Sequence, residues 1–322
     1  MARWSDGLRM TTLERLDEWK TAGTITGAQH AGLSAIVCRD RFSLFVELNG
    51  ILYIGVVTLV AGLGWTFRDY VTSLGDVAIL SMLVLLMTVS FGYCFAKAPA
   101  YSNVETDSPS FAFDYVLYFG CLVLSATLTF VETRFAIFGG WDTHLFLAAV
   151  VFGVLAYRFD NRFVLSLALS TLAAFLGLRL SGFDTIDTDR LRIAAVVYGA
   201  LLLGAGASLK QLAIKPHFLD VYLQLGANAM LIAMASGVVD RNAGWLYLLA
   251  LLMLSAASIY LGIRFTRFAF VAYGTVFGYL GLSTWLLDAM AGITSILAYF
   301  VITGTIVVAA LVLISRRFGR DE

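Results

Sequence analysis

Long apolar runs recur along the chain from about residue 48 to its end, and short polar stretches separate them. A helix needs about 20 mostly apolar residues to cross the hydrocarbon core of a bilayer. The runs also lack the alternation of apolar and polar residues that marks the strands of a membrane barrel. The chain is therefore predicted to be all-α, a polytopic helical membrane bundle of about ten transmembrane helices. The predicted spans are residues 48–67, 77–96, 113–131, 143–158, 163–180, 193–209, 221–239, 245–262, 268–287 and 293–315. The fourth span is the weakest, because its apolar stretch is short unless Trp141 and Thr143 join it.

Residues 1–46 have a different pattern, with no apolar run long enough to cross a membrane. The motif Thr11-Thr12-Leu13-Glu14 fits a capping box, in which the side chains at the first and last positions bond to each other's backbone N–H groups. Gly23 fits the left-handed position that ends a helix. The motif Thr26-Gly27-Ala28-Gln29 repeats the capping box with glutamine. Together these signals predict two short helices joined by a turn, which is a helical hairpin.

The chain is thus predicted to consist of a cytoplasmic helical hairpin at residues 1–46, a ten-helix transmembrane domain at residues 47–317 and a short cytoplasmic tail at residues 318–322. A hairpin this small buries too little surface to be stable alone, so we expect it to pack on the membrane domain or on a partner. Two interpretations stay open, a cap that seals helix ends and a docking or regulatory module. The candidate docking residues are Leu16, Trp19, Ile25 and Gln29.

The distribution of lysine and arginine predicts the orientation of the spans. Cytoplasmic loops of membrane proteins carry an excess of these residues. With ten spans, 16 of the 22 Lys and Arg residues fall on the side of the amino terminus and six on the opposite side. We therefore expect both termini to lie in the cytoplasm.

The composition agrees with a membrane protein and argues against several other classes. Hydrophobic residues make up 60% of the chain and charged residues 14%, whereas an average soluble protein is about 45–50% apolar and about 25% charged. The formal net charge of zero argues against nucleic-acid binding, which needs a basic face. The cysteines form no CxxC pair, and His30, His144 and His217 have no second ligand at metal-site spacing. Without a Walker, GxSxG or HExxH motif, we predict no enzymatic activity, no metal and no cofactor, and the lipid bilayer as the main partner.

Charged residues such as Asp114 and Arg179 lie within about a turn of the predicted span ends, and the polar residues deeper inside the spans are uncharged. The candidate intramembrane polar face consists of Asn49, Gln224 and Asn228. Gln224 and Asn228 are four residues apart and therefore share one face of the seventh span. That face either lines a cavity or bonds to a neighbouring helix.

Small residues recur at four-residue spacing in three spans, which favours close packing of helices in a bilayer. The predicted small-residue faces are Ala200, Gly204 and Ser208 in the sixth span, Ala229, Ala233 and Gly237 in the seventh, and Gly274 and Gly278 in the ninth.

A hairpin of the form Leu16-x-x-Trp19-x-x-x-Gly23-x-Ile25-Thr26-x-x-Gln29 leads into a span that begins Glu47-Leu48-Asn49-Gly50-Ile51-Leu52-Tyr53-Ile54-Gly55. This arrangement resembles the bacterial predicted membrane proteins called domain of unknown function 2157. The resemblance covers about residues 10–65 by motif and the remainder by hydropathy. It implies a location in the bacterial inner membrane and brings no activity with it.

Two functional hypotheses follow. The first is a non-enzymatic membrane scaffold or accessory subunit of a larger inner-membrane assembly, with the hairpin as docking element and other membrane protein subunits as partners. The alternative is a small-molecule transporter, because ten spans with both termini inside can divide into five-plus-five inverted repeats.

Overall fold

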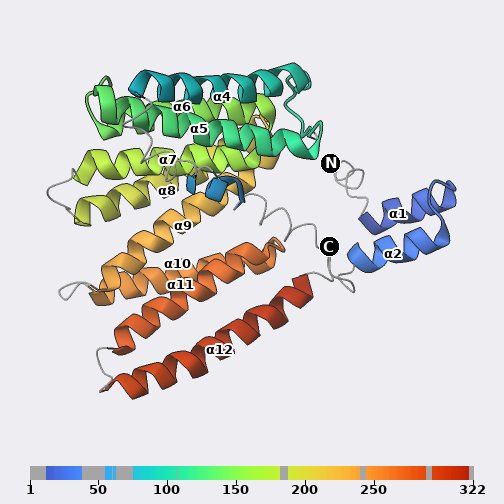
Figure 1. Cartoon of the computed structure of the whole chain (residues 1–322). Helices are drawn as coiled ribbons and strands as arrows, with labels where there is room; N and C mark the ends of the chain where they lie inside the picture. The colour runs from blue at the N-terminus through green and yellow to red at the C-terminus, as the bar shows by residue number, and fades with distance from the viewer. Residues whose placement is uncertain are drawn as a thin grey trace. The chain divides into compact units, whose positions relative to one another are not determined.

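The computed structural model describes residues 12–37, 55–59, 61–62, 75–106, 108–181, 188–239, 244–287 and 292–318. Every regular element within these ranges is a helix (Figure 1). Nine helices of the described ranges are long and apolar enough to cross a membrane by length and composition. The predicted all-α, polytopic helical bundle is therefore confirmed, and the helices imply a lipid bilayer as their environment.

The helices are α1 Thr12–Thr21, α2 Gly27–Val37, α4 Asp76–Lys97, α5 Phe111–Phe135, α6 Trp141–Phe159, α7 Arg162–Ser181, α8 Thr188–Gln211, the short 3-10 helix η1 Pro216–Phe218, α9 Leu219–Val238, α10 Gly244–Arg264, α11 Phe268–Leu287 and α12 Ile293–Phe318. Helices α4 to α12 correspond, one to one, to the second to tenth predicted spans. Most of the first predicted span, residues 48–67, lies outside the described residues, although residues 55–59 and 61–62 are helical.

Helix α6 corresponds to the weakest of the predicted spans. It begins at Trp141 and includes Thr143, so it has 19 residues. At 1.5 Å per residue this helix is about 28 Å long. That length is close to the hydrocarbon thickness of about 30 Å.

The hairpin of α1 and α2 forms as its sequence signals predict. Gly23 has a φ of +72°, and the Thr24 N–H donates to the Trp19 carbonyl at 2.9 Å, which is the helix-ending pattern that favours glycine. The Thr26 N–H donates to the Gln29 side chain at 2.9 Å, and the Gln29 N–H donates back to the Thr26 hydroxyl at 3.2 Å. The second capping box is therefore confirmed. The first depends on Thr11, which lies outside the described residues.

The chain divides into two compact units, one of residues 51–251 and one of residues 1–50 together with 252–322. The unit of residues 51–251 contains three helical hairpins, in which α4 packs against α5, α6 against α7 and α8 against α9. The predicted domain boundaries at residues 46 and 317 stay a prediction.

The three hairpins of this unit share one core. Among its fully buried side chains are Phe113 and Leu117 of α5, Phe152 of α6, Leu165 of α7 and Phe218 of η1. Outside this core, large apolar side chains on the same helices are exposed. Such a surface would be a liability in water and faces lipid in a bilayer.

Helices α8 and α9 approach each other through glycines. A Cβ atom on Gly199 would lie 2.6 Å from the Gly226 carbonyl oxygen, and a Cβ atom on Gly226 would lie 2.8 Å from the Gly199 carbonyl oxygen. Only glycine permits this contact, because the two backbones meet directly.

The close-packing face of α8 therefore differs from the predicted one. Ala200, Gly204 and Ser208 are exposed, and Gly199 and Gly206 are buried instead. The two faces are adjacent on the helix and both carry small residues, so spacing alone does not select between them. In α9 the predicted packing face is correct for Ala233 and Gly237, because both residues are buried.

In the unit that contains residues 252–322, the predicted Gly274–Gly278 motif of α11 packs on α10. A Cβ atom on Gly274 would lie 2.5 Å from the carbonyl oxygen of Ser255, and the Ser258 hydroxyl donates to the Phe270 carbonyl at 2.8 Å. Small residues thus allow direct contact between backbone and side chains of the two helices.

Candidate functional site

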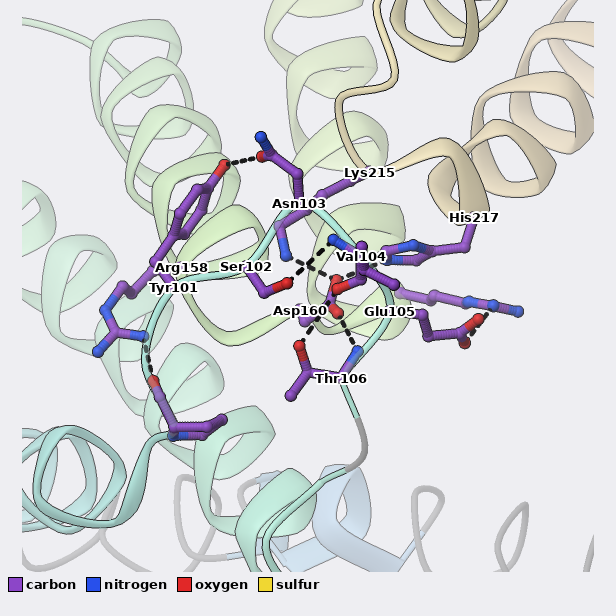
Figure 2. Close-up of polar contacts among 12 residues, drawn as sticks. Tyr101, Ser102, Asn103, Val104, Glu105, Thr106, Arg158, Asp160, Lys215 and His217 are labelled. Carbon is purple, nitrogen blue, oxygen red and sulfur yellow. Dashed lines mark hydrogen bonds and ion pairs between the residues drawn. The ribbon is translucent and has the colours of Figure 1, made fainter.

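A polar cluster joins three connections between helices of the unit of residues 51–251, those from α4 to α5, from α6 to α7 and from α8 to α9 (Figure 2). Asp160 lies at its centre, and Lys215, His217 and the backbone N–H of Thr106 surround the carboxylate. We call these four residues the loop cluster.

The short reversal between α6 and α7 positions Asp160. This residue ends α6 in the left-handed conformation, with a φ of 58°, and its N–H donates to the Ala156 carbonyl. Aspartate tolerates this conformation better than most residues. The next residue, Asn161, accepts the Val164 N–H on its side-chain oxygen at 2.9 Å and so caps the start of α7. The reversal therefore holds the Asp160 carboxylate at the end of the hairpin.

The connection between α8 and α9 positions the two basic residues. Lys215 also has a left-handed backbone, with a φ of 43°, and η1 starts at the next residue with Pro216. The Lys215 ammonium lies 5.2 Å from the ring centre of Tyr101 and 5.7 Å from that of Phe218, within the range of cation–π attraction. His217 is the second residue of η1, and its ring also contacts Asp160.

Three donors bind the two oxygens of the Asp160 carboxylate. Its Oδ1 atom lies 2.9 Å from Nζ of Lys215 and 2.5 Å from Nε2 of His217. Its Oδ2 atom accepts the Thr106 N–H at 2.8 Å. The side chains of Lys215, Asp160 and His217 are only 1%, 6% and 8% exposed.

The donors determine the charge state of Asp160. Burial alone would raise the pKa of its carboxyl, but hydrogen bonds from Lys215, from the Thr106 N–H and from His217 outweigh burial and hold this pKa below its ordinary value of 3.8. A carboxyl whose pKa is lowered on folding stabilises the folded state above its unfolded pKa and loses that contribution as the pH falls through the folded pKa. The cluster is therefore intact at neutral pH and weakens only below about pH 4.

In the loop cluster, one carboxylate contacts both a histidine and a lysine. A carboxylate that orients a histidine is a component of acid–base relays, but here Lys215 neutralises the same carboxylate. The Nδ1 atom of His217 is buried and has no hydrogen-bond partner among the described residues. No group of three side chains suited to holding a metal ion occurs in the described part of the chain.

Sequence reasoning missed the loop cluster. Sequence spacing gives His217 no partner, whereas the structure pairs it with Asp160, 57 positions earlier in the chain. A usable signal was present, since Asp160 and Lys215 have opposite charges and lie in connections that ten alternating spans place on the same side. The structure brings those connections together, which agrees with the predicted alternation.

The structure places two of the three residues of the predicted intramembrane polar face. Gln224 and Asn228 lie together on α9, where the Asn228 amide nitrogen donates to the Gln224 backbone carbonyl at 2.8 Å. This contact stays within one helix, so both interpretations of the face remain predictions. Asn49 lies outside the described residues.

The four candidate docking residues of the hairpin have different environments. Leu16 is buried, Ile25 is half-buried, and Gln29 is exposed and engaged in the capping box. The Trp19 side chain is 49% exposed and is therefore the largest accessible apolar group of the four. The two helices are also linked by His30 of α2 and Asp17 of α1, at 2.8 Å.

Two further ion pairs lie at the ends of helices α4 to α7 that are opposite to the loop cluster. Asp142 at the start of α6 pairs with Arg179 at the end of α7 at 2.9 Å, and Asp76 of α4 pairs with Arg134 of α5 at 3.3 Å. These pairs are partly exposed, unlike the loop cluster.

A buried arginine, Arg192, lies near the start of α8, at the end of that helix opposite to the loop cluster. Arg192 of α8 donates to Asp189 at 2.8 Å and to the carbonyl of Ser236 in α9 at 3.0 Å, and its guanidinium lies 5.0 Å from the ring centre of Tyr247 in α10. Arg192 therefore links three helices, and its buried charge is paired.

Residues 17–165 of the chain match the family described as predicted membrane protein, DUF2157. The resemblance inferred from the sequence is confirmed, and the match extends beyond residue 65 through α4, α5 and α6 to the first turn of α7. It includes Thr106 and Asp160 of the loop cluster and ends before Lys215. No curated protein and no solved structure matches the chain.

Proposed function

We propose that this chain, whose residues 17–165 match a family of predicted membrane proteins, is a non-enzymatic scaffold or accessory subunit of a larger assembly in the bacterial inner membrane. Both termini lie in the cytoplasm, and the α1–α2 hairpin is the element that docks a partner.

The position of the buried charges is the observation that carries this proposal. Among the described residues, the buried charged side chains of Glu132, Arg192, Lys215 and Asp160 lie at or near helix ends. Ionisable groups along substrate or proton pathways lie inside spans, where they face a bundle interior or a cavity. Here the buried charges tie helix ends together, as Arg192 at the start of α8 does by donating to the carbonyl of Ser236 near the end of α9 at 3.0 Å. Such ties suit a rigid framework.

The hairpin supplies the second line of support. Its second helix has a capping box and its first ends at a left-handed glycine, so the turn between them is well defined. Trp19 lies near the end of α1 with about half of its side chain exposed. Tryptophan is among the residues that most often dominate binding energy at protein interfaces.

The orientation is supported by the loop cluster together with the charge count. The cluster brings the connections at Thr106, Asp160 and Lys215 to one side of the bundle. That side belongs to the set of connections that carries 16 of the 22 Lys and Arg residues, a bias typical of the cytoplasm.

Replacing Trp19 with alanine tests the docking role. Truncating an interfacial tryptophan of this kind costs about 2 kcal/mol or more, which is about 30-fold in affinity. We expect purification from native membranes in mild detergent to recover a membrane protein with the wild-type chain, and Trp19→Ala to reduce its recovery at least about tenfold. Lys20→Ala, at the adjacent exposed position, is the matched control and should retain the partner.

Two outcomes would contradict the proposal. One is recovery of the wild-type chain only as a lone monomer. The other is equal recovery of the partner by the Trp19→Ala and Lys20→Ala variants, because the hairpin face would then make no contribution.

A further inference from the structure

The irregular connection from α4 towards α5 lies against the Asp160 and Lys215 side chains of the loop cluster. We call residues 98–106 the strap. Figure 2 shows most of it beside the Asp160 and Lys215 side chains. Most strap residues are exposed, among them Tyr101 and Val104, so the strap buries little apolar surface of its own. Its position must therefore depend mainly on polar contacts.

Three of those contacts come from the reversal between α6 and α7 and from the helix ends beside it. Arg158 donates to the Pro99 carbonyl at 3.1 Å, and Arg162 pairs with Glu105 at 2.5 Å. Between these arginines, Asp160 accepts the backbone N–H of the strap residue Thr106.

The fourth contact joins the strap to Lys215, whose ammonium lies near the Tyr101 ring. Hydrogen bonds within the strap itself are local, such as that from the Tyr101 hydroxyl to the Asn103 side chain at 3.1 Å. The strap is thus held by side chains of other segments, namely the two other connections and the adjoining ends of α6 and α7.

Through Lys215, the position of the strap depends on the charge of Asp160. Its side chain is 1% exposed, and its ammonium pairs with Asp160 at 2.9 Å. A buried ammonium is tolerable only while it is paired, because removing one partner of a buried ion pair leaves an uncompensated charge out of water. If Asp160 loses its charge, Lys215 keeps its own charge only if water reaches it, and the exposed strap is the segment beside it that can move with the least loss of buried apolar contact.

We propose that the strap is a releasable cover, which the charge of Asp160 holds closed over Lys215 and His217. Loss of that charge opens the strap while the packed helices beneath it stay folded. The exposed Glu105–Arg162 pair and the Arg158 hydrogen bond are too weak to keep the strap closed over an unpaired ammonium.

Lys215 and His217 are the charged or titratable groups that contact the carboxylate. The segments packed around it also carry Tyr101 and Glu105 in the strap, Arg158 near the end of α6, Arg162 at the start of α7, and Asp114 of α5, which binds Asn161 at 2.8 Å. Because Asp160 stays ionised at neutral pH, the strap stays closed there, and removal of the carboxylate or competition for its partners opens it.

The reactivity of Lys215 towards an amine-acetylating reagent tests the proposal on the full-length protein in detergent. Exposed Lys210 serves as internal reference for the reagent. We expect Asp160→Asn to raise the acetylation rate of Lys215 relative to Lys210 at least tenfold, measured by mass spectrometry. Asp142→Asn is the matched control, because it breaks the ion pair with Arg179 at the other end of the same hairpin. It should leave the Lys215 rate at the wild-type value.

Deuterium uptake separates opening of the strap from unfolding. In Asp160→Asn we expect faster uptake in residues 98–106 and unchanged uptake in α6 to α9. The double variant Asp160→Asn/Lys215→Met has no unpaired charge, and its strap should return to wild-type uptake. A Lys215 rate unchanged by Asp160→Asn would overturn the proposal. So would equally faster uptake throughout α6 to α9, or a strap that stays open in the double variant.

Discussion

Replacing Asp160 with alanine is expected to lower the free energy of unfolding by about 3 kcal/mol, one of the two largest single-residue losses that the structure predicts. Removing one partner of a buried ion pair costs about 3–5 kcal/mol. The lower end applies here because the strap can open and let water reach Lys215, which is otherwise 1% exposed. Thermal or denaturant unfolding in detergent at pH 7 measures the loss.

The control for this experiment is Asp142→Ala. Asp142 likewise forms an ion pair, with Arg179 across the α6–α7 hairpin, but the Arg179 side chain is 70% exposed. Exposed pairs contribute about 0–1 kcal/mol. Losses of similar size in the two variants would show that burial of Lys215 does not set the energy of the loop cluster.

Replacing Gly199 with leucine is expected to cost about as much, about 3 kcal/mol, the upper part of the usual range for overpacking. The first added carbon would lie 2.6 Å from both the Gly226 carbonyl oxygen and Cγ of Met230. Because a backbone oxygen cannot turn aside as a flexible side chain does, α8 and α9 must separate. A fall in the unfolding temperature of the purified protein measures the effect.

Gly204→Leu is the matched control, because it makes the same change in the same helix. Nothing lies within 4 Å of a Cβ atom at Gly204. This variant should be neutral or slightly stabilising, since leucine also favours a helix by up to about 1 kcal/mol over glycine. If Gly204→Leu were the more damaging change, α8 would pack through the other face.

The membrane helices were predictable because hydropathy is a local property. Helix α11 has the predicted bounds, residues 268–287. The hairpin was predictable for the same reason, since the capping residues Thr26 and Gln29 and the turn residue Gly23 act over a few positions.

The loop cluster and the packing face of α8 depend on which segments meet in space. Asp160 and His217 are 57 positions apart, and they meet only because the α6–α7 and α8–α9 connections lie side by side at one end of the helices. The left-handed backbone at Lys215 directs its side chain there, and lysine gives no local signal for that conformation. In α8, Gly199 and Ala200 begin two adjacent small-residue faces, and only the position of α9 selects between them.

The connections that carry the loop cluster are expected on the cytoplasmic side of the membrane, and cysteine labelling in intact bacterial cells tests this most directly. Ala100→Cys would report on the strap, and Ile137→Cys on the connection between α5 and α6, since both positions are exposed. Cys38 would be replaced by serine, and the remaining natural cysteines, Cys94 and Cys121, are buried. We predict that a membrane-impermeant maleimide labels Ile137→Cys in intact cells and labels Ala100→Cys only after the membrane is permeabilised. Labelling of Ala100→Cys in intact cells would contradict a cytoplasmic loop cluster.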